Sequence, residues 1–113
     1  MAIVVETEER EGWKVVHVAG EIDLRTAPEL RERLAALLDD GADRVVVDLG
    51  QVHFLDSTAL SVMVGAHRRL VLLGTVLHLA AGGVQVERVL TTTGLSRVFA
   101  VHDSVDEAVG TTT

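Results

Sequence analysis

The first 19 residues contain two short runs that favour β-structure. The runs, at 3–7 and 13–19, are rich in valine and are separated by the charged segment EREG. Short runs of β-branched residues bounded by polar residues and glycine favour strands, and so short a connection favours an antiparallel hairpin. The chain is therefore expected to begin its sheet with two paired strands.

A helical pattern follows a predicted loop at 20–25. Leucines recur three to four residues apart and stop before Gly41, namely Leu30, Leu34, Leu37 and Leu38. This spacing puts one apolar stripe on a helix, and glycine is a common helix stop. Thr26 and Glu29 have capping-box spacing and Pro28 falls in the first turn, so the helix is expected to begin there.

The middle of the chain repeats this order of strand and helix. Residues 44–49 contain three consecutive valines, which is typical of a strand buried on both faces, and Gly50-Gln51 predicts a turn. Asp56-Ser57-Thr58 suits a helix start, because side chains of these types bond the free N–H groups there. The helix is expected to extend to Gly74, with an apolar stripe made of Leu60, Met63, Val64, His67 and Val71.

Two further pairs of strand and helix complete the chain. Strands are predicted at 76–80 and 98–101, and helices at 84–93 and after Ser104, which has capping-box spacing to Glu107. The order is β-β-α-β-α-β-α-β-α, and right-handed crossovers would pack the helices on a sheet. We therefore predict an α/β fold with a mostly parallel sheet of four or five strands, an antiparallel N-terminal strand and about four helices.

Composition excludes several classes of function. The chain has 113 residues, 48% of them hydrophobic, and is expected to form a single domain over 1–113. A net charge of −7 and only 3% aromatic residues offer neither a basic stripe nor a stacking platform, so we expect no nucleic acid partner. With no cysteine, no long apolar run and no leader-like start, the protein is expected to be cytoplasmic and to have no membrane partner.

Motifs for catalysis, metals and nucleotides are weak. No glycine-rich phosphate motif is present, Gly82-Gly83 being the nearest. Asp48 invites comparison with the acceptor of a two-component receiver, but Lys14 is the only lysine, so the lysine that such a site needs is missing. No metal-ligand spacing occurs among the histidines, which are His17, His53, His67, His78 and His102. We expect no enzyme activity, metal or cofactor.

Three stretches together resemble the STAS family of anti-sigma factor antagonists. They are GEID with TAPELR within 20–31, VDL through FLDSTAL over 47–60, and TGL at 93–95. Their order and spacing match the family over nearly the whole chain. The resemblance implies the STAS-type α/β fold and the function of an anti-sigma factor antagonist, which is a binding protein and not an enzyme.

The resemblance also implies a phosphorylation switch. Ser57 would be the phosphate acceptor and Thr58 a secondary one. The implied partners are an anti-sigma factor with serine kinase activity, which uses ATP, and a phosphatase that acts on Ser57. The unphosphorylated protein would bind the anti-sigma factor and free the sigma factor. The partner-binding residues would be Asp23, Asp56, Ser57, Thr58, Ala59 and Ser61.

The alternatives to this switch stay open. Asp56-Ser57-Thr58 alone is also explained as an ordinary helix cap, although free N–H groups and the dipole of a helix start suit a phosphate. The family commonly has glycine where this chain has Ala59 and Ser61, which favours a STAS scaffold or regulatory module that binds without phosphorylation. The Gly82-Gly83 turn leaves room for a sensor of small molecules or nucleotides.

Overall fold

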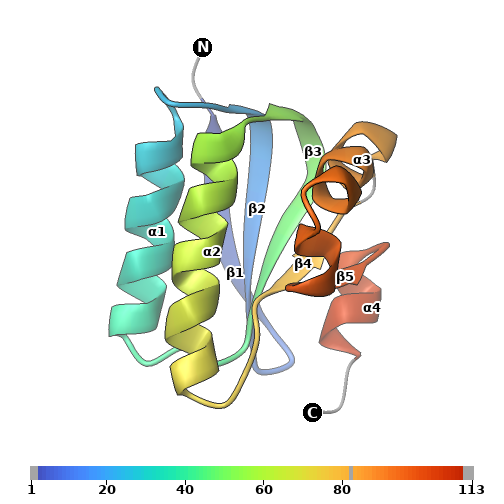
Figure 1. Ribbon diagram of the computed structural model, residues 1–113. Helices are drawn as coiled ribbons and strands as arrows, with labels where there is room; N and C mark the ends of the chain where they lie inside the picture. The colour runs from blue at the N-terminus through green and yellow to red at the C-terminus, as the bar shows by residue number, and fades with distance from the viewer. Residues whose placement is uncertain (1–2, 82, 111–113) are drawn as a thin grey trace.

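One mixed β-sheet organises the protein (Figure 1). Across residues 3–81 and 83–110, which the computed structural model describes, five strands lie in the order β1-β2-β3-β4-β5. β1 pairs antiparallel with β2, and the remaining neighbours pair in parallel, which confirms the predicted α/β fold. The strands are β1 Val4–Arg10, β2 Trp13–Ile22, β3 Val45–Leu55, β4 His78–Ala80 and β5 Ala100–His102.

Helices cover both faces of the sheet, but unequally. The described residues form α1 (Ala27–Asp39), α2 (Ser57–Leu72), α3 (Val84–Thr92) and α4 (Val105–Val109), with a 3₁₀ turn, η1, at Leu95–Arg97. Buried side chains of α1, α2 and α3 share one large core with the sheet, and α1 and α2 lie side by side on it (Figure 1). The short α4 closes a smaller core around Trp13 on the opposite face.

The three consecutive valines of β3 explain why the strand is central. Val45 and Val47 belong to the large core and Val46 to the small one, and all three are buried. Successive side chains of a strand point to opposite faces, so a run without polar residues is compatible only with a sheet covered on both sides. The predicted doubly buried strand is confirmed.

The turn predicted at Gly50-Gln51 is wrong, because β3 continues through both residues to Leu55. Its neighbour β2 is also longer than predicted and remains paired with it as far as Ile22 and Leu55, with irregularities of register between them. Bulges of this kind absorb residues that would otherwise end a strand. The two strands therefore end side by side, which determines where the next residues lie.

The apolar stripe predicted for α2 is correct only in part. Leu60 and Met63 are buried, but Val71 is 50% exposed. The buried face instead uses small residues that a search for large apolar side chains passes over, such as Ala59 and Ala66. The buried face thus runs through positions 59, 62–63, 66 and 70, so Val71 lies beside this face and is left exposed.

Candidate functional site

Two aspartates follow directly on the paired ends of β2 and β3. Ile22 is paired with Leu55, and the N–H of Asp56 donates a hydrogen bond to the carbonyl oxygen of Ile22 at 3.1 Å. Carboxyl ends of neighbouring parallel strands share one edge of a sheet, where ligands and partners commonly bind α/β proteins. The loops that begin with Asp23 and Asp56 therefore form one surface.

Asp56 caps α2, as predicted. Its Oδ1 atom accepts hydrogen bonds from the N–H groups of Thr58 at 2.9 Å and Ala59 at 3.2 Å. These bonds satisfy two donors that a helix start otherwise leaves free. The expectation that the helix start offers those N–H groups to a phosphate is consequently wrong for Thr58 and Ala59.

Ser57 is the first residue of α2, and its side chain is exposed. Its hydroxyl forms no hydrogen bond with any residue that the structure describes, so no internal bond has to break before another molecule uses it. Thr58 is half-buried, and Ser61 is exposed one turn further along the helix. A groove of about 420 Å³ lies beside Ser57 and Ser61 and is also lined by Leu95 of η1.

Ala59 does not belong to the accessible set. Its side chain is 0% exposed and contributes to the core, so it has no surface with which to touch a partner. One side of a helix faces the sheet, and in the first turn of α2 that side carries Ala59 and Leu60. We therefore remove Ala59 from the expected partner-binding residues.

The start of α1 is built differently from the predicted capping box. The Thr26 hydroxyl donates to the carbonyl oxygen of Glu21 at 2.7 Å and accepts from the N–H of Asp23 at 2.9 Å. It forms no bond that caps the helix. Asp23 instead holds the turn that precedes the helix, because its Oδ1 accepts from the N–H groups of Arg25 at 2.9 Å and Thr26 at 3.2 Å.

These bonds determine the charge state of Asp23. Burial alone would raise the pKa of its carboxyl group, but the two backbone N–H groups and the Arg25 guanidinium hold that pKa below its usual value. Hydrogen bonds donated to a carboxylate stabilise its ionised form. Asp23 therefore adds a fixed negative charge to the surface that carries Ser57.

Two apolar side chains at this edge were missed in the sequence. Leu24 is 73% exposed and Phe54 is 43% exposed, and Phe54 lies in the last paired positions of β3. Leu24 is an isolated apolar residue between Asp23 and Arg25, which was an available signal, whereas Phe54 stands next to Leu55 and gave none. Exposed leucine and phenylalanine beside polar groups are common in surfaces that bind proteins.

The other candidate chemistry lies elsewhere. His78 and His102 approach to 2.9 Å between Nδ1 and Nε2, and burial together with His102 lowers the pKa of His78 to about 4. Asp48 binds His17 at 2.7 Å on a sheet face away from Ser57. Within 3–81 and 83–110 no three ligand-type side chains gather as a metal site.

Gly82 lies outside the described residues, and Gly83 is the residue before α3. Among the helices that the structure describes, none is both long and apolar enough to cross a membrane.

Comparison with known proteins finds relatives that match nearly the whole chain. The model of the STAS domain matches residues 4–108. A protein of Bacillus subtilis (strain 168) named anti-sigma-B factor antagonist is 36% identical over 101 residues, which cover 89% of this chain and 92% of the relative. One of the same name from Staphylococcus aureus (strain NCTC 8325 / PS 47) is 30% identical over 106 residues, covering 94% and 98%. The crystal structure of an anti-sigma factor antagonist from Mycobacterium paratuberculosis superimposes with a TM-score of 0.89 and 32% identity, covering 96% of this chain and 92% of the other.

Proposed function

Because this chain belongs to the STAS domain family, we propose that it is an anti-sigma factor antagonist that phosphorylation switches off. With Ser57 unmodified it binds an anti-sigma factor that has serine kinase activity, and the sigma factor is released in the cytoplasm. Phosphate on Ser57 ends this binding, and a phosphatase restores it. An antagonist acts by binding, so we assign no catalytic residue.

One observation carries the proposal: the Ser57 hydroxyl is exposed and free of internal hydrogen bonds at the start of α2. A kinase can reach such a group without unfolding the helix. Thr58 is half-buried and is therefore the poorer acceptor. The names of the relatives agree with the proposed role.

The proposed binding surface combines polar and apolar groups. Asp23, Asp56, Ser57, Thr58 and Ser61 supply its polar part, and Leu24 and Phe54 can supply apolar contacts beside them. A few apolar anchors surrounded by a polar rim are typical of protein interfaces.

The effect of the phosphate follows from what already occupies the helix start. A phosphate adds about −1.5 to −2 charges, and Asp56 already holds the N–H groups of Thr58 and Ala59. The phosphate therefore remains in solvent in the free protein, where its charge costs little. In a closed interface it would be desolvated next to Asp56, and a loss of roughly 1.4 to 2.8 kcal/mol weakens binding about ten- to a hundredfold.

The test uses the purified anti-sigma factor kinase of the organism that encodes this chain. Incubation with ATP should add one phosphate at Ser57, seen by mass spectrometry, and end complex formation in a titration. Ser57→Asp should weaken binding at least tenfold, while Thr91→Asp, which adds the same charge on α3, should not. Equal binding by both variants would refute the switch.

The scaffold alternative has its own outcome in this assay. Tight binding of the same anti-sigma factor, without phosphate on Ser57 after incubation with ATP, would identify a module that binds constitutively. Ala59 no longer favours that alternative, because its buried methyl group does not stand in the way of a kinase.

A further inference from the structure

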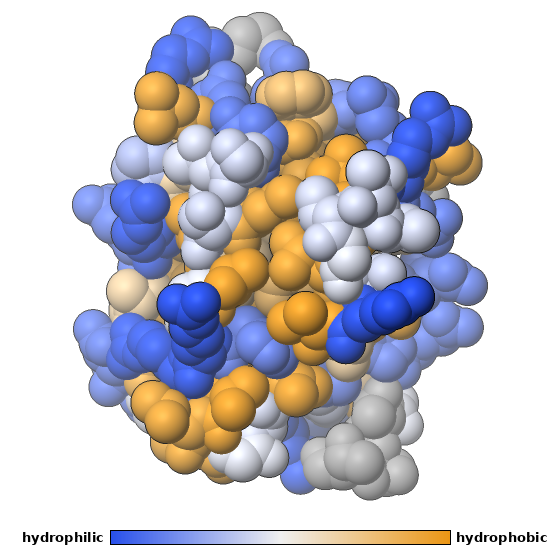
Figure 2. Space-filling model, in the orientation of Figure 1, coloured by the Kyte–Doolittle hydropathy of each residue, from blue (hydrophilic) through white to orange (hydrophobic). Residues whose placement is uncertain are grey.

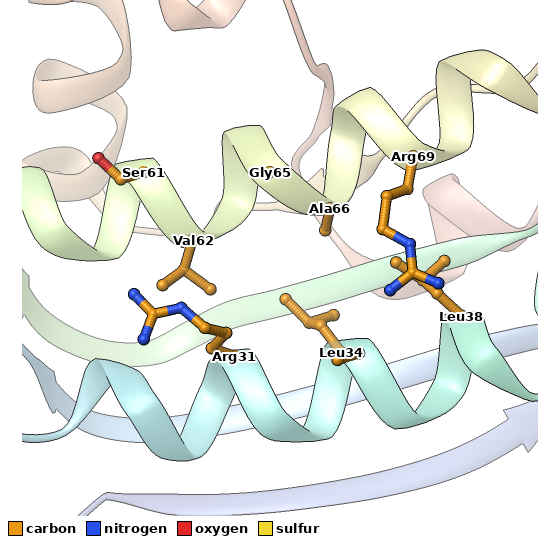
Figure 3. Close-up of a pocket in the computed structure, with 9 residues that line it drawn as sticks. Arg31, Leu34, Leu38, Ser61, Val62, Gly65, Ala66 and Arg69 are labelled. Atoms are coloured by element: carbon orange, nitrogen blue, oxygen red, sulfur yellow. The ribbon is translucent and has the colours of Figure 1, made fainter.

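A second surface lies along the outside of α1 and α2. Between the two helices runs a groove of about 240 Å³ (Figure 3). Its floor is apolar, with Leu34 of α1 facing Val62 and Ala66 of α2, and Arg31 and Arg69 stand at its two ends. From Arg31 to Leu38 the groove follows two turns of α1, or about 11 Å.

Gly65 in the wall of this groove has no internal explanation. It lies in the middle of the 16-residue α2, where glycine is a poor helix former. A Cβ atom built there would meet nothing within 4 Å, so neither packing nor backbone conformation requires glycine. The missing side chain leaves space on the outside, where the backbone of another molecule can approach closely.

The border of the groove is positively charged in a protein whose net charge is −7. Arg31 forms no ion pair with the residues that the structure describes, and Arg69 binds only one oxygen of Asp39, at 2.7 Å. The other acidic side chains of α1, Glu29 and Glu32, do not line the groove. Guanidinium groups with spare donors select carboxylates in a partner.

We propose that this groove binds one amphipathic α-helix of the anti-sigma factor, with carboxylates at both ends of its apolar stripe. Its apolar side chains would lie against Val62 and Ala66, and its carboxylates would bind Arg31 and Arg69. Helices commonly dock in this way into apolar grooves. Figure 2 shows hydrophobic side chains at the surface in the middle of this face of the molecule, between hydrophilic ones. The inference rests on the proposed function and identifies how the partner is held.

The groove is continuous with the surface around Ser57. Ser61 and Gly65 line both this groove and the one beside Ser57, which also contains Arg68. Arg68 has no ion pair within the described part of the chain. A phosphate on Ser57 would bring negative charge to the same surface and repel the carboxylates of a docked helix. The docked helix thus gives the switch a second site of action.

A variant whose larger side chain fills the groove tests the proposal. Gly65→Leu adds a side chain whose Cβ meets nothing within 4 Å, and leucine favours helix, so the variant is expected to fold while its side chain blocks the groove. Binding of the anti-sigma factor should weaken at least tenfold in isothermal titration calorimetry. The matched control is Ala36→Leu, because Ala36 is exposed on α1 but does not line the groove. Equal affinities of the two variants would overturn the proposal.

Charge reversal tests the carboxylates. The double change Arg31→Glu and Arg69→Glu should weaken binding at least tenfold and reduce its dependence on salt, because these are the two arginines of the groove. Arg88→Glu and Arg97→Glu together make the same change in net charge and are the control, since neither residue lines either groove. An equal loss in both doubles would mean that only total charge matters, and would overturn the assignment of an acidic helix.

A third test uses the unmodified protein, so its result does not depend on whether a variant folds. In NMR spectra of the labelled chain, adding the anti-sigma factor should shift amide signals along 31–38 and 61–69. Shifts confined to residues around Leu24, Phe54 and Ser57 would overturn the groove and leave the proposed function intact. Failure of the unmodified protein to bind at all would instead remove the proposed function.

Discussion

Two hydroxyl residues stand at the starts of the two neighbouring helices, and only one of them is free. Thr26 is 8% exposed, and its hydroxyl both donates to Glu21 and accepts from Asp23. Ser57 is exposed and has no such bond with the described residues. The comparison teaches that the residue type does not decide whether a hydroxyl at a helix start is available for modification. In these two helices, availability depends on how many residues separate the hydroxyl residue from the aspartate before it.

The two aspartates explain the difference. Asp56 directly precedes Ser57, so its carboxylate occupies the next N–H groups and the serine points outward. Asp23 comes three residues before Thr26, so the chain makes a full turn and returns the threonine to the end of β2. At the same edge of the sheet, the Thr26 hydroxyl therefore stabilises the fold and the Ser57 hydroxyl is exposed to solvent.

The largest expected effect is the difference in stability between two variants, one that lacks the Thr26 hydroxyl and one that lacks the Ser57 hydroxyl. Thr26→Val keeps the shape of the side chain but leaves the carbonyl of Glu21 and the N–H of Asp23 without their partner. Leaving buried polar groups unsatisfied costs about 2 kcal/mol. Ser57→Ala should change the free energy of unfolding by less than about 0.5 kcal/mol. Urea denaturation of both variants measures this difference, and equal losses would contradict the comparison.

The sequence was informative where one local rule determines the outcome. The valine run predicts β3, and the Asp56 cap predicts the start of α2, because both depend on neighbouring residues. The sequence was uninformative where contacts with a distant strand determine the local structure. Thr26 and Glu29 have the spacing of a capping box, yet the Thr26 hydroxyl donates its hydrogen bond to the carbonyl oxygen of Glu21 in β2.

The candidate site shows the same limits. A motif over 56–61 names Ser57 correctly as an exposed residue but also includes Ala59, which the helix turns into the core. The extension of β3 through Gly50 depends on its pairing with β2, which a local turn signal cannot reveal. The groove between α1 and α2 requires two segments that are adjacent only after folding.

The next largest effect concerns the aspartate beside the free serine. Asp56→Ala removes the cap of α2 and should cost about 1 kcal/mol of stability. Asp56→Asn should cost much less, because asparagine is an equally good cap, although it removes the negative charge next to Ser57. Thermal denaturation compares the two, and a similar loss in both would mean that charge and not the hydrogen bonds supports the helix start.

A smaller effect contrasts the bodies of the two helices. Gly65→Ala in α2 should raise the free energy of unfolding by about 0.5 to 1 kcal/mol, since alanine is the better helix former and its Cβ meets nothing. Ala36→Gly on the exposed side of α1 should lower it by a similar amount. Thermal denaturation should therefore shift in opposite directions. A loss of stability in Gly65→Ala would show that the glycine is required by the fold and not by a partner.

The smallest effect is a dependence on pH at the start of α1. The N–H groups and the guanidinium around Asp23 hold its pKa below 3.8, so the unfolded chain takes up this proton before the folded one does. The contribution of Asp23 is therefore complete above pH 3.8 and is lost as the pH falls through the lower, folded value. Asp23→Asn keeps an accepting oxygen but no charge, so its deficit in urea denaturation should shrink on acidification. A deficit that stays constant with pH would mean that the ionisation of Asp23 does not stabilise the fold, and that the two helix starts differ only in their hydroxyls.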